Sequence, residues 1–238
     1  MRTLMLSASD PNTAPTAANL IMNGELVAIP TETVYGLATD ALNGAAVADI
    51  FAAKGRPMDN PLIVHVAEIE DIERFNLVSD FPLKAKLLAQ HFWPGPLTII
   101  MNKSDIIPDE VSAGLSTVAI RLPSHKVARE LIEESGTVLA APSANRSGSP
   151  SPTTAQHVMN DLEGRISGIV DGGNTKYEKR DIAENVPCWI KENCIQCNQC
   201  AFVCPHACIR PFSLDDKDLP YAHLDKSEVI KSIGEQDK

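Results

Sequence analysis

The stretch KGRPMDNPL, residues 54–62, replaces an apolar helical pattern with cations, prolines and amide-bearing side chains. The residues before it, 44–54, carry apolar side chains at the spacing of one helix face, so they predict a helix. Gly55 then stands where a helix end favours a left-handed residue, and Pro57 prevents the helix from continuing. The sequence therefore predicts a helix that ends in a rigid cationic loop.

Two explanations account for Lys54 and Arg56 at this helix end. Cations are stabilised near the negative C-terminal end of a helix dipole, which would make the pair structural. Alternatively, the two cations and the amide of Asn60 form a loop that binds an anion. The local sequence leaves both explanations open.

Composition bounds the class of protein. The 238 residues are 44% hydrophobic, enough to bury a full core in one or two domains. A formal net charge of −10 argues against a broad basic face for nucleic acid, although a local basic cleft is compatible with it. No apolar run reaches the roughly 20 residues of a membrane span, and residues 1–19 lack a secretory signal. We expect a soluble cytoplasmic protein without membrane contact.

Helical and strand patterns alternate along the chain, which predicts an α/β domain. Besides 44–54, helices are expected over residues 14–23, 80–91, 126–134 and 156–162. Strands are expected over residues 25–29, 62–66, 97–101, 117–122, 137–141 and 166–170.

Four polar features interrupt these elements. The octapeptide PTETVYGL, residues 30–37, is read as a turn, in which the threonines could simply cap a following helix. His65 lies in an apolar strand, where it could be a satisfied core histidine or a functional group. Arg121 lies in another apolar strand and needs an anionic partner, from protein or ligand. The loop PSANRSG, residues 142–148, follows a strand end, where open α/β sheets often place functional groups.

Two common nucleotide-binding motifs are absent from the sequence. It contains neither GxxxxGK[ST] nor GxGxxG, so neither a P-loop nor a dinucleotide-binding unit is supported. Any nucleotide must be held in a different way.

Seven segments occur in a characteristic order over residues 1–173. They are PTETVYGL, KGRPMDNPL, the strand with His65, FWPGPLT, VAIRLPSH, APSANRSGSPSPT and GIVDGG. Their order and spacing resemble those of the YrdC-type threonylcarbamoyl-adenylate synthases. The resemblance implies a twisted open mixed α/β sheet around a concave, positively charged cavity. It also implies a nucleotidyltransferase that converts L-threonine, bicarbonate and ATP into threonylcarbamoyl-AMP and pyrophosphate, for the machinery that makes threonylcarbamoyladenosine in tRNA.

The resemblance assigns site residues motif by motif. Those that match the L-threonine site are Thr33, His65, Arg121 and Ser143. Those that match the ATP site are Lys54, Arg56, Asn60, Thr117, Asn145 and Thr153. We expect Lys54 and Arg56 to be catalytic, because fixed donors stabilise the charge on phosphate oxygens while pyrophosphate leaves, with Mg²⁺ on the phosphates. Arg121 suits the bidentate recognition of a carboxylate.

The sequence departs from this pattern after Gly173. The family continues with a glycine-rich turn and strands that bear a serine and an arginine, which complete the two sites. Here the residues NTKYEKRD follow instead. The resemblance therefore predicts a YrdC-like domain over residues 1–173 that is incomplete at its C-terminal end, a loss that would impair activity.

All six cysteines lie between residues 188 and 208, unlike a disulfide framework. The run Cys194-x2-Cys197-x2-Cys200-x3-Cys204-Pro is the one that binds 4Fe–4S clusters in bacterial ferredoxins, with zinc as the minor alternative. The surrounding residues 177–211 resemble the ferredoxin-like segment of pyruvate:ferredoxin oxidoreductase. We thus expect residues 174–238 to be half of a ferredoxin-like segment with a polar tail, which makes the chain a chimera.

Two other function classes stay open. The chain could be an iron–sulfur electron-transfer fragment of a pyruvate:ferredoxin oxidoreductase with a passenger N-terminal part. It could also be a non-catalytic YrdC domain that binds RNA in its basic concavity, which the acidic balance of the chain disfavours.

Overall fold

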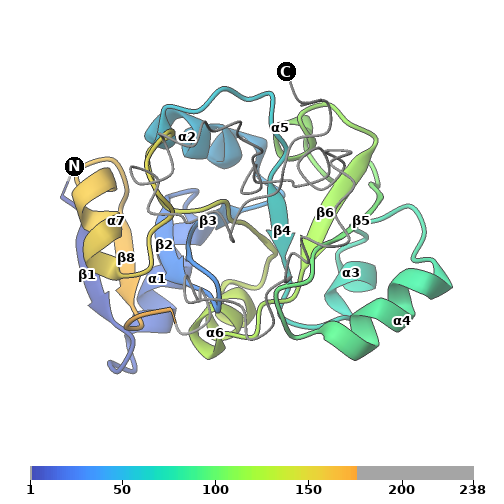
Figure 1. Cartoon of the computed structure of the whole chain (residues 1–238), viewed down its shortest axis with the longest axis horizontal. Coiled ribbons are helices and arrows are strands. Elements are labelled where there is room, and N and C mark those ends of the chain that lie inside the picture. The colour runs from blue at the N-terminus through green and yellow to red at the C-terminus, as the bar shows by residue number, and fades with distance from the viewer. Residues whose placement is uncertain (1, 176–238) are drawn as a thin grey trace, which may run out of the picture. The chain divides into compact units, whose positions relative to one another are not determined.

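The computed structural model describes residues 2–175, which form one eight-stranded sheet and seven helices (Figure 1). The strands are β1 (Leu4–Ser7), β2 (Val27–Pro30), β3 (Tyr35–Asp40), β4 (Ile63–His65), β5 (Ile99–Asn102), β6 (Thr117–Arg121), β7 (Leu139–Ala140) and β8 (Gly168–Asp171). The helices are α1 (Thr13–Met22), α2 (Gly44–Lys54), α3 (Asp71–Arg74), α4 (Leu83–Phe92), α5 (Asp109–Ser112), α6 (Lys126–Ser135) and α7 (Ala155–Leu162).

The sheet is open and mixed, which confirms the predicted α/β fold of residues 1–173. Its strand order is β1-β8-β2-β3-β7-β4-β6-β5. Strand β8 is parallel to β1 and to β2, and β4 is parallel to β6. The remaining neighbours are antiparallel. The parallel pair β4 and β6 brings two strand ends to the same edge, which matters for the site described below.

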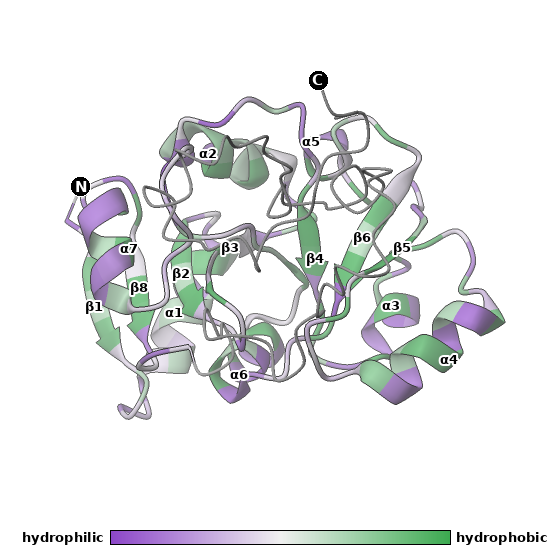
Figure 2. Cartoon of the chain, in the orientation of Figure 1, coloured by the Kyte–Doolittle hydropathy of each residue, from purple (hydrophilic) through white to green (hydrophobic). Residues whose placement is uncertain are grey.

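Both faces of the sheet are covered, and β2 shows how. Val27 and Ile29 belong to a core cluster that includes α1 and α6, whereas Ala28 belongs to a second, larger cluster that includes α2 and α7. Successive strand residues point to opposite faces, so the two clusters lie on opposite sides of the sheet. The apolar strands at the centre are visible in Figure 2.

Helix α2 confirms the prediction for residues 44–54. The side chain of Asn43 caps its start by accepting a hydrogen bond from Ala46 N at 3.2 Å. Gly55 ends the helix in the left-handed conformation, with φ of 62°, as its position in the sequence predicted. The loop with Arg56 and Asn60 therefore starts from a fixed helix end.

The prediction of a turn over residues 30–37 was wrong in its second half. Residues 35–40 form β3, which pairs antiparallel with β2, and the threonines cap no helix. Thr31 instead closes the hairpin: its hydroxyl donates to Val34 O at 2.6 Å and accepts from the N–H of Thr33 and of Val34. Strand β3 is buried along nearly its whole length, so it lacks the polar alternation that marks a strand in sequence.

The remaining predicted elements agree with the structure to within three residues at each end. The sequence analysis missed β1 and the short helices α3 and α5. The predicted cluster ligands Cys194, Cys197, Cys200 and Cys204, and the ferredoxin-like segment beyond Thr175, lie outside the described residues. Among residues 2–175, none of the helices has both the length and the apolarity needed to cross a membrane.

The burial of β3 predicts that Leu37→Ala is strongly destabilising. Leu37 is 0% exposed, so truncation leaves a cavity and should lower the free energy of unfolding by about 2–5 kcal/mol. Leu83→Ala is the matched control, because Leu83 is 72% exposed and its loss should cost less than about 0.5 kcal/mol. Urea denaturation followed by circular dichroism compares the two. Equal small effects would contradict the central place of β3.

Candidate functional site

The candidate site lies on one face of the parallel pair β4 and β6. His65 is paired in register with Arg121. Because side chains alternate along a strand, Thr117 and Arg121 share a face, while Val118 and Ile120 point the other way into the core. Thr117 and Arg121 are four residue steps apart along the strand, a span of about 13 Å. The strand β6 thus holds two polar positions at a fixed distance on the same side of the sheet.

Arg121 is held at the carboxyl end of β6 by the β2–β3 hairpin. Its Nη2 donates to Glu32 Oε1 at 2.6 Å and to Thr33 Oγ1 at 3.2 Å. The side chains of Arg121 and Glu32 are only 10% and 5% exposed. The anionic partner that the sequence required for Arg121 is therefore a protein group. Glu32 was missed as a site residue, although it is the carboxylate next to Thr33 in the same polar turn.

His65 is a buried, neutral member of this cluster. Burial, reinforced by the charge of Arg121, lowers the pKa of His65 to about 3. Its Nδ1 lies 3.2 Å from Ile63 O. A neutral ring whose Nδ1–H donates to that carbonyl keeps Nε2 as an acceptor, which suits a hydroxyl donor.

Lys54 binds a loop of its own chain. Its Nζ donates to Ser143 O and, at 2.6 Å, to Asn145 O, and it lies 3.5 Å from Asn145 Oδ1. The residue is 3% exposed. Burial and the charge of Arg56 lower the pKa of Lys54 to about 8, while the carboxylate of Asp161 opposes that shift. The lysine is thus still protonated near pH 7, and its ammonium fixes the loop after β7.

The same loop is fixed on its other side by β3. Leu37 N donates to Pro142 O at 2.7 Å, and Ala144 N donates to Tyr35 O at 2.8 Å. Within the loop, Asn145 Nδ2 donates to Ser149 O at 2.7 Å. Asn145 is consequently buried, and its amide shapes the loop from inside.

Arg56 is the more exposed of the two cations at the end of α2. Its guanidinium carbon lies 5.9 Å from the centroid of the Phe51 ring, a cation–π contact, and its Nη2 donates to Asn60 O at 3.3 Å. Its charge depresses the pKa of Lys54, which places the two groups close together. Arg56 is therefore better placed than Lys54 to contact a ligand anion directly.

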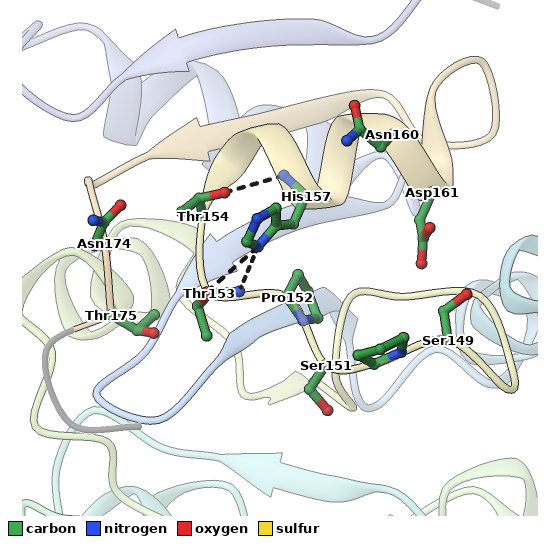
Figure 3. A pocket seen from close by; sticks show the side chains of 11 residues that line it. Ser149, Ser151, Pro152, Thr153, Thr154, His157, Asn160, Asp161, Asn174 and Thr175 are labelled. Atoms are coloured by element: carbon green, nitrogen blue, oxygen red, sulfur yellow. Dashed lines mark hydrogen bonds between the residues drawn. The ribbon is translucent and has the colours of Figure 1, made fainter. Parts of the chain in front are cut away.

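A cavity of about 740 Å³ opens beside the loop that follows β7 (Figure 3). Its lining consists of hydroxyl, amide and proline residues with His157 and Asp161, namely Ser149, Pro150, Ser151, Pro152, Thr153, Thr154, His157, Asn160, Asp161, Asn174 and Thr175. Thr153 is the one predicted site residue in that lining. Asp161 links the cavity to Lys54, because its charge raises the pKa of that lysine.

The structure brings six of the ten predicted residues together in two groups. Thr33, His65 and Arg121 gather at the carboxyl ends of β4 and β6, whereas Lys54, Ser143 and Asn145 contact one another through backbone and amide oxygens. The outlying positions are Thr117 at the start of β6, the pair Arg56 and Asn60, and Thr153 on the cavity.

The hydroxyl of Tyr35 connects the β2–β3 hairpin to the end of the sheet. The hydroxyl of Tyr35 donates to Gly173 O at 2.7 Å and accepts from Gly172 N at 3.3 Å, and burial raises the pKa of Tyr35 to about 12. This contact ties the hairpin to the segment after β8.

Among residues 2–175, no group of three or more His, Cys, Asp and Glu side chains is arranged to hold a metal ion.

Comparison with known proteins finds relatives that are named threonylcarbamoyl-AMP synthases. The chain is 57% identical over 171 residues to the threonylcarbamoyl-AMP synthase of Bacillus subtilis (strain 168), which covers 71% of the chain and 49% of the relative. It is 44% identical over 234 residues to the Pyrococcus abyssi protein of the same name, covering 93% and 68%. The chain thus spans about half the length of the Bacillus relative.

A solved structure and a family model agree with these relatives. The crystal structure of P. abyssi Sua5 complexed with L-threonine superposes with a TM-score of 0.70 at 49% identity, covering 74% of this chain and 51% of that one. The family model of Sua5, YciO and YrdC proteins, described as telomere recombination, matches residues 19–184, well over half of the chain. The match extends past Gly173, where the sequence pattern was expected to end. The chain belongs to the Sua5/YciO/YrdC family.

Proposed function

We propose that this protein is a nucleotidyltransferase that joins L-threonine, bicarbonate and ATP into threonylcarbamoyl-AMP and releases pyrophosphate. The observation that carries the proposal is that one domain holds both a buried cluster around Arg121, with Glu32 and Thr33, and a cationic helix end at Lys54 and Arg56. The names of the relatives and the threonine complex of P. abyssi Sua5 support it.

The cluster at the carboxyl ends of β4 and β6 suits an amino acid. The guanidinium of Arg121 would bind the threonine carboxylate by charge-assisted hydrogen bonds. The neutral ring of His65 would accept a hydrogen bond from the threonine hydroxyl, with the hydroxyl of Thr33 beside Arg121. Ser143 keeps the threonine-binding role that the family resemblance assigns to it. Because these side chains are already buried and held by hydrogen bonds, they orient the amine with little further loss of side-chain conformational entropy in the protein.

The loop after α2 suits the phosphates of ATP. Arg56 would contact phosphate oxygens directly, with Asn60, Thr117 and Thr153 as further donors. Lys54 would act differently from the direct contact expected from sequence, because its ammonium already binds backbone oxygens of residues 143 and 145. We therefore assign Lys54 the role of a positioning residue that fixes the loop after β7, with the buried amide of Asn145 inside it.

The chemistry needs placement and charge stabilisation more than a dedicated acid or base. The threonine amine condenses with bicarbonate to a carbamate with loss of water, and a carbamate oxygen then attacks the α-phosphorus while pyrophosphate leaves. Negative charge builds up on phosphate oxygens during that step, and Arg56 stabilises it. Mg²⁺ enters with ATP as part of the substrate and neutralises further phosphate charge.

The wider context of the activity is part of the same proposal. The product would pass to the enzymes that make threonylcarbamoyladenosine in tRNA, in the cytoplasm, and direct RNA contact is the alternative use of the domain. The predicted 4Fe–4S segment lies outside the described residues and stays a prediction from sequence.

Removal of the Arg56 guanidinium should strongly lower turnover without unfolding the protein, because Arg56 is only half-buried. We expect Arg56→Ala to lower threonine-dependent release of pyrophosphate by about 100-fold or more, because it removes a donor to the developing phosphate charge. Arg2→Ala, at an exposed position at the chain start, is the matched control and should leave the rate unchanged. A colorimetric pyrophosphate assay with and without threonine measures the effect. Undiminished turnover in a folded Arg56→Ala protein would refute the role of Arg56.

The lowered pKa of Lys54 predicts that ATP affinity depends on pH. Between about pH 7 and pH 9 the ammonium of Lys54 loses its proton, since its pKa is about 8. A neutral amine is a weaker donor, so the loop loosens and affinity for Mg-ATP should fall over this interval. Tyr35 and His65 do not titrate there, because their pKa values are about 12 and about 3.

Calorimetric titration of Mg-ATP at the two pH values, in the absence of threonine, tests this dependence. In Lys54→Met the affinity should be low at both values, and the difference between them should disappear. Wild-type affinity that is the same at both pH values would show that the protonation of Lys54 does not control the loop.

A further inference from the structure

Glu32 and Arg121 form a buried ion pair that leaves part of each group unused. The pair is made by Glu32 Oε1 and Arg121 Nη2, at 2.6 Å. The second carboxylate oxygen, Oε2, is buried and accepts no hydrogen bond from residues 2–175. Arg121 Nε is likewise buried and donates none within that part of the chain. Within the described part of the chain, the ion pair thus includes a buried acceptor and a buried donor that have no hydrogen-bond partner.

Unpartnered buried groups of this kind need an explanation, because nearly all buried polar atoms in proteins have a hydrogen-bond partner. A single-ended contact is also unusual for an arginine and a carboxylate, whose geometry favours two parallel bonds. A ligand that completes both groups must carry a donor and an acceptor close together, and a cation beside an anion gives the strongest hydrogen bonds to these two charged groups. An α-amino acid in its zwitterionic form has this property, with its ammonium and carboxylate on neighbouring carbons.

The surroundings of the pair agree with such a ligand. Among the described residues, the side chains that hydrogen-bond Arg121 are Glu32 and Thr33, and Glu32 is the one with a negative charge. His65, in register with Arg121, is kept neutral because burial lowers its pKa to about 3. Glu32 is therefore the acidic group that can balance a ligand ammonium in this cluster.

Building on the proposed synthase function, we propose that Glu32 is a further substrate-binding residue, whose Oε2 accepts a hydrogen bond from the α-ammonium group of the amino acid. Arg121 donates to the carboxylate of the same ligand. The two contacts fix both ends of the amino-acid backbone and direct the nitrogen that must be carbamoylated. The pair also makes the site specific for α-amino acids over α-hydroxy acids.

A comparison of two ligands on two proteins separates this role from a structural one. L-Threonine and 2,3-dihydroxybutanoate of matching configuration differ in having an ammonium or a hydroxyl at the α-carbon. Calorimetry on the wild-type chain should show that threonine binds about tenfold tighter or more, since a charge-assisted bond is lost in the analogue. In Glu32→Gln the two ligands should bind within about twofold of each other, because the amide has no charge.

Two further variants secure the result. Glu70→Gln makes the same chemical change at an exposed glutamate and should keep the wild-type preference. Glu32→Asp keeps the charge with a shorter reach, so it should retain a preference for threonine of reduced size. If thermal melting shows that Glu32→Gln does not fold, Glu32→Asp serves as the test in its place. A folded Glu32→Asp protein that shows no preference for threonine would overturn the proposal.

The outcomes distinguish this proposal from the proposed function. If Glu32→Gln weakens both ligands by the same factor, Glu32 only orients Arg121 and the proposal is wrong. If the wild-type chain binds both ligands equally well, the proposal also fails while threonine binding stands. If the wild-type chain binds neither ligand, the proposed synthase function itself is overturned, and the role of Glu32 with it.

Discussion

The candidate site depends on one buried charge, the ammonium of Lys54 at the end of α2. Its hydrogen bonds to the carbonyls of residues 143 and 145 attach the loop after β7 to α2, and backbone bonds attach that loop to β3. Desolvation makes such a charge costly unless its donors are used, and here Nζ has three oxygens within 3.5 Å. The helix, the loop and the hairpin therefore hold one another in place through a polar contact rather than an apolar one.

Strand register is the second constraint, because it decides which side chains reach the site. The pairing of His65 with Arg121 puts both on the face opposite Val64 and Ile120, which are fully buried in the core. A slip of one residue would exchange the two faces and bury polar groups in the apolar cluster, at a cost that no local contact offsets. The apolar face of β4 and β6 thus fixes the geometry of the polar face.

Sequence predicted what short-range chemistry controls and failed where distant partners decide. The helix 44–54 and its left-handed Gly55 follow from local spacing and were predicted correctly. The need of Arg121 for an anion was also evident, but its partner Glu32 lies 89 residues away, and the polar turn that contains Glu32 does not show which strand it contacts. The carbonyl partners of Lys54 are 89 and 91 residues away. The lysine that the sequence predicted as a phosphate ligand therefore binds backbone oxygens of a distant loop instead. Strand β3 was missed because burial on both faces removed its periodicity.

The distribution of buried charge separates the site from the fold. Among residues 2–175, the buried acidic and basic side chains are Glu32, Lys54, His65, Asp71 and Arg121. Asp71 caps a turn by accepting from the N–H of Ala67 and of Glu68, and the other four belong to the candidate site. Buried ionisable groups contribute little to stability compared with apolar residues of the same size, so the gathering of four of them in the candidate site is not explained by folding. The apolar clusters stabilise the sheet, whereas these polar contacts fix the hairpin and the loop, and site geometry can therefore be lost while the sheet remains folded.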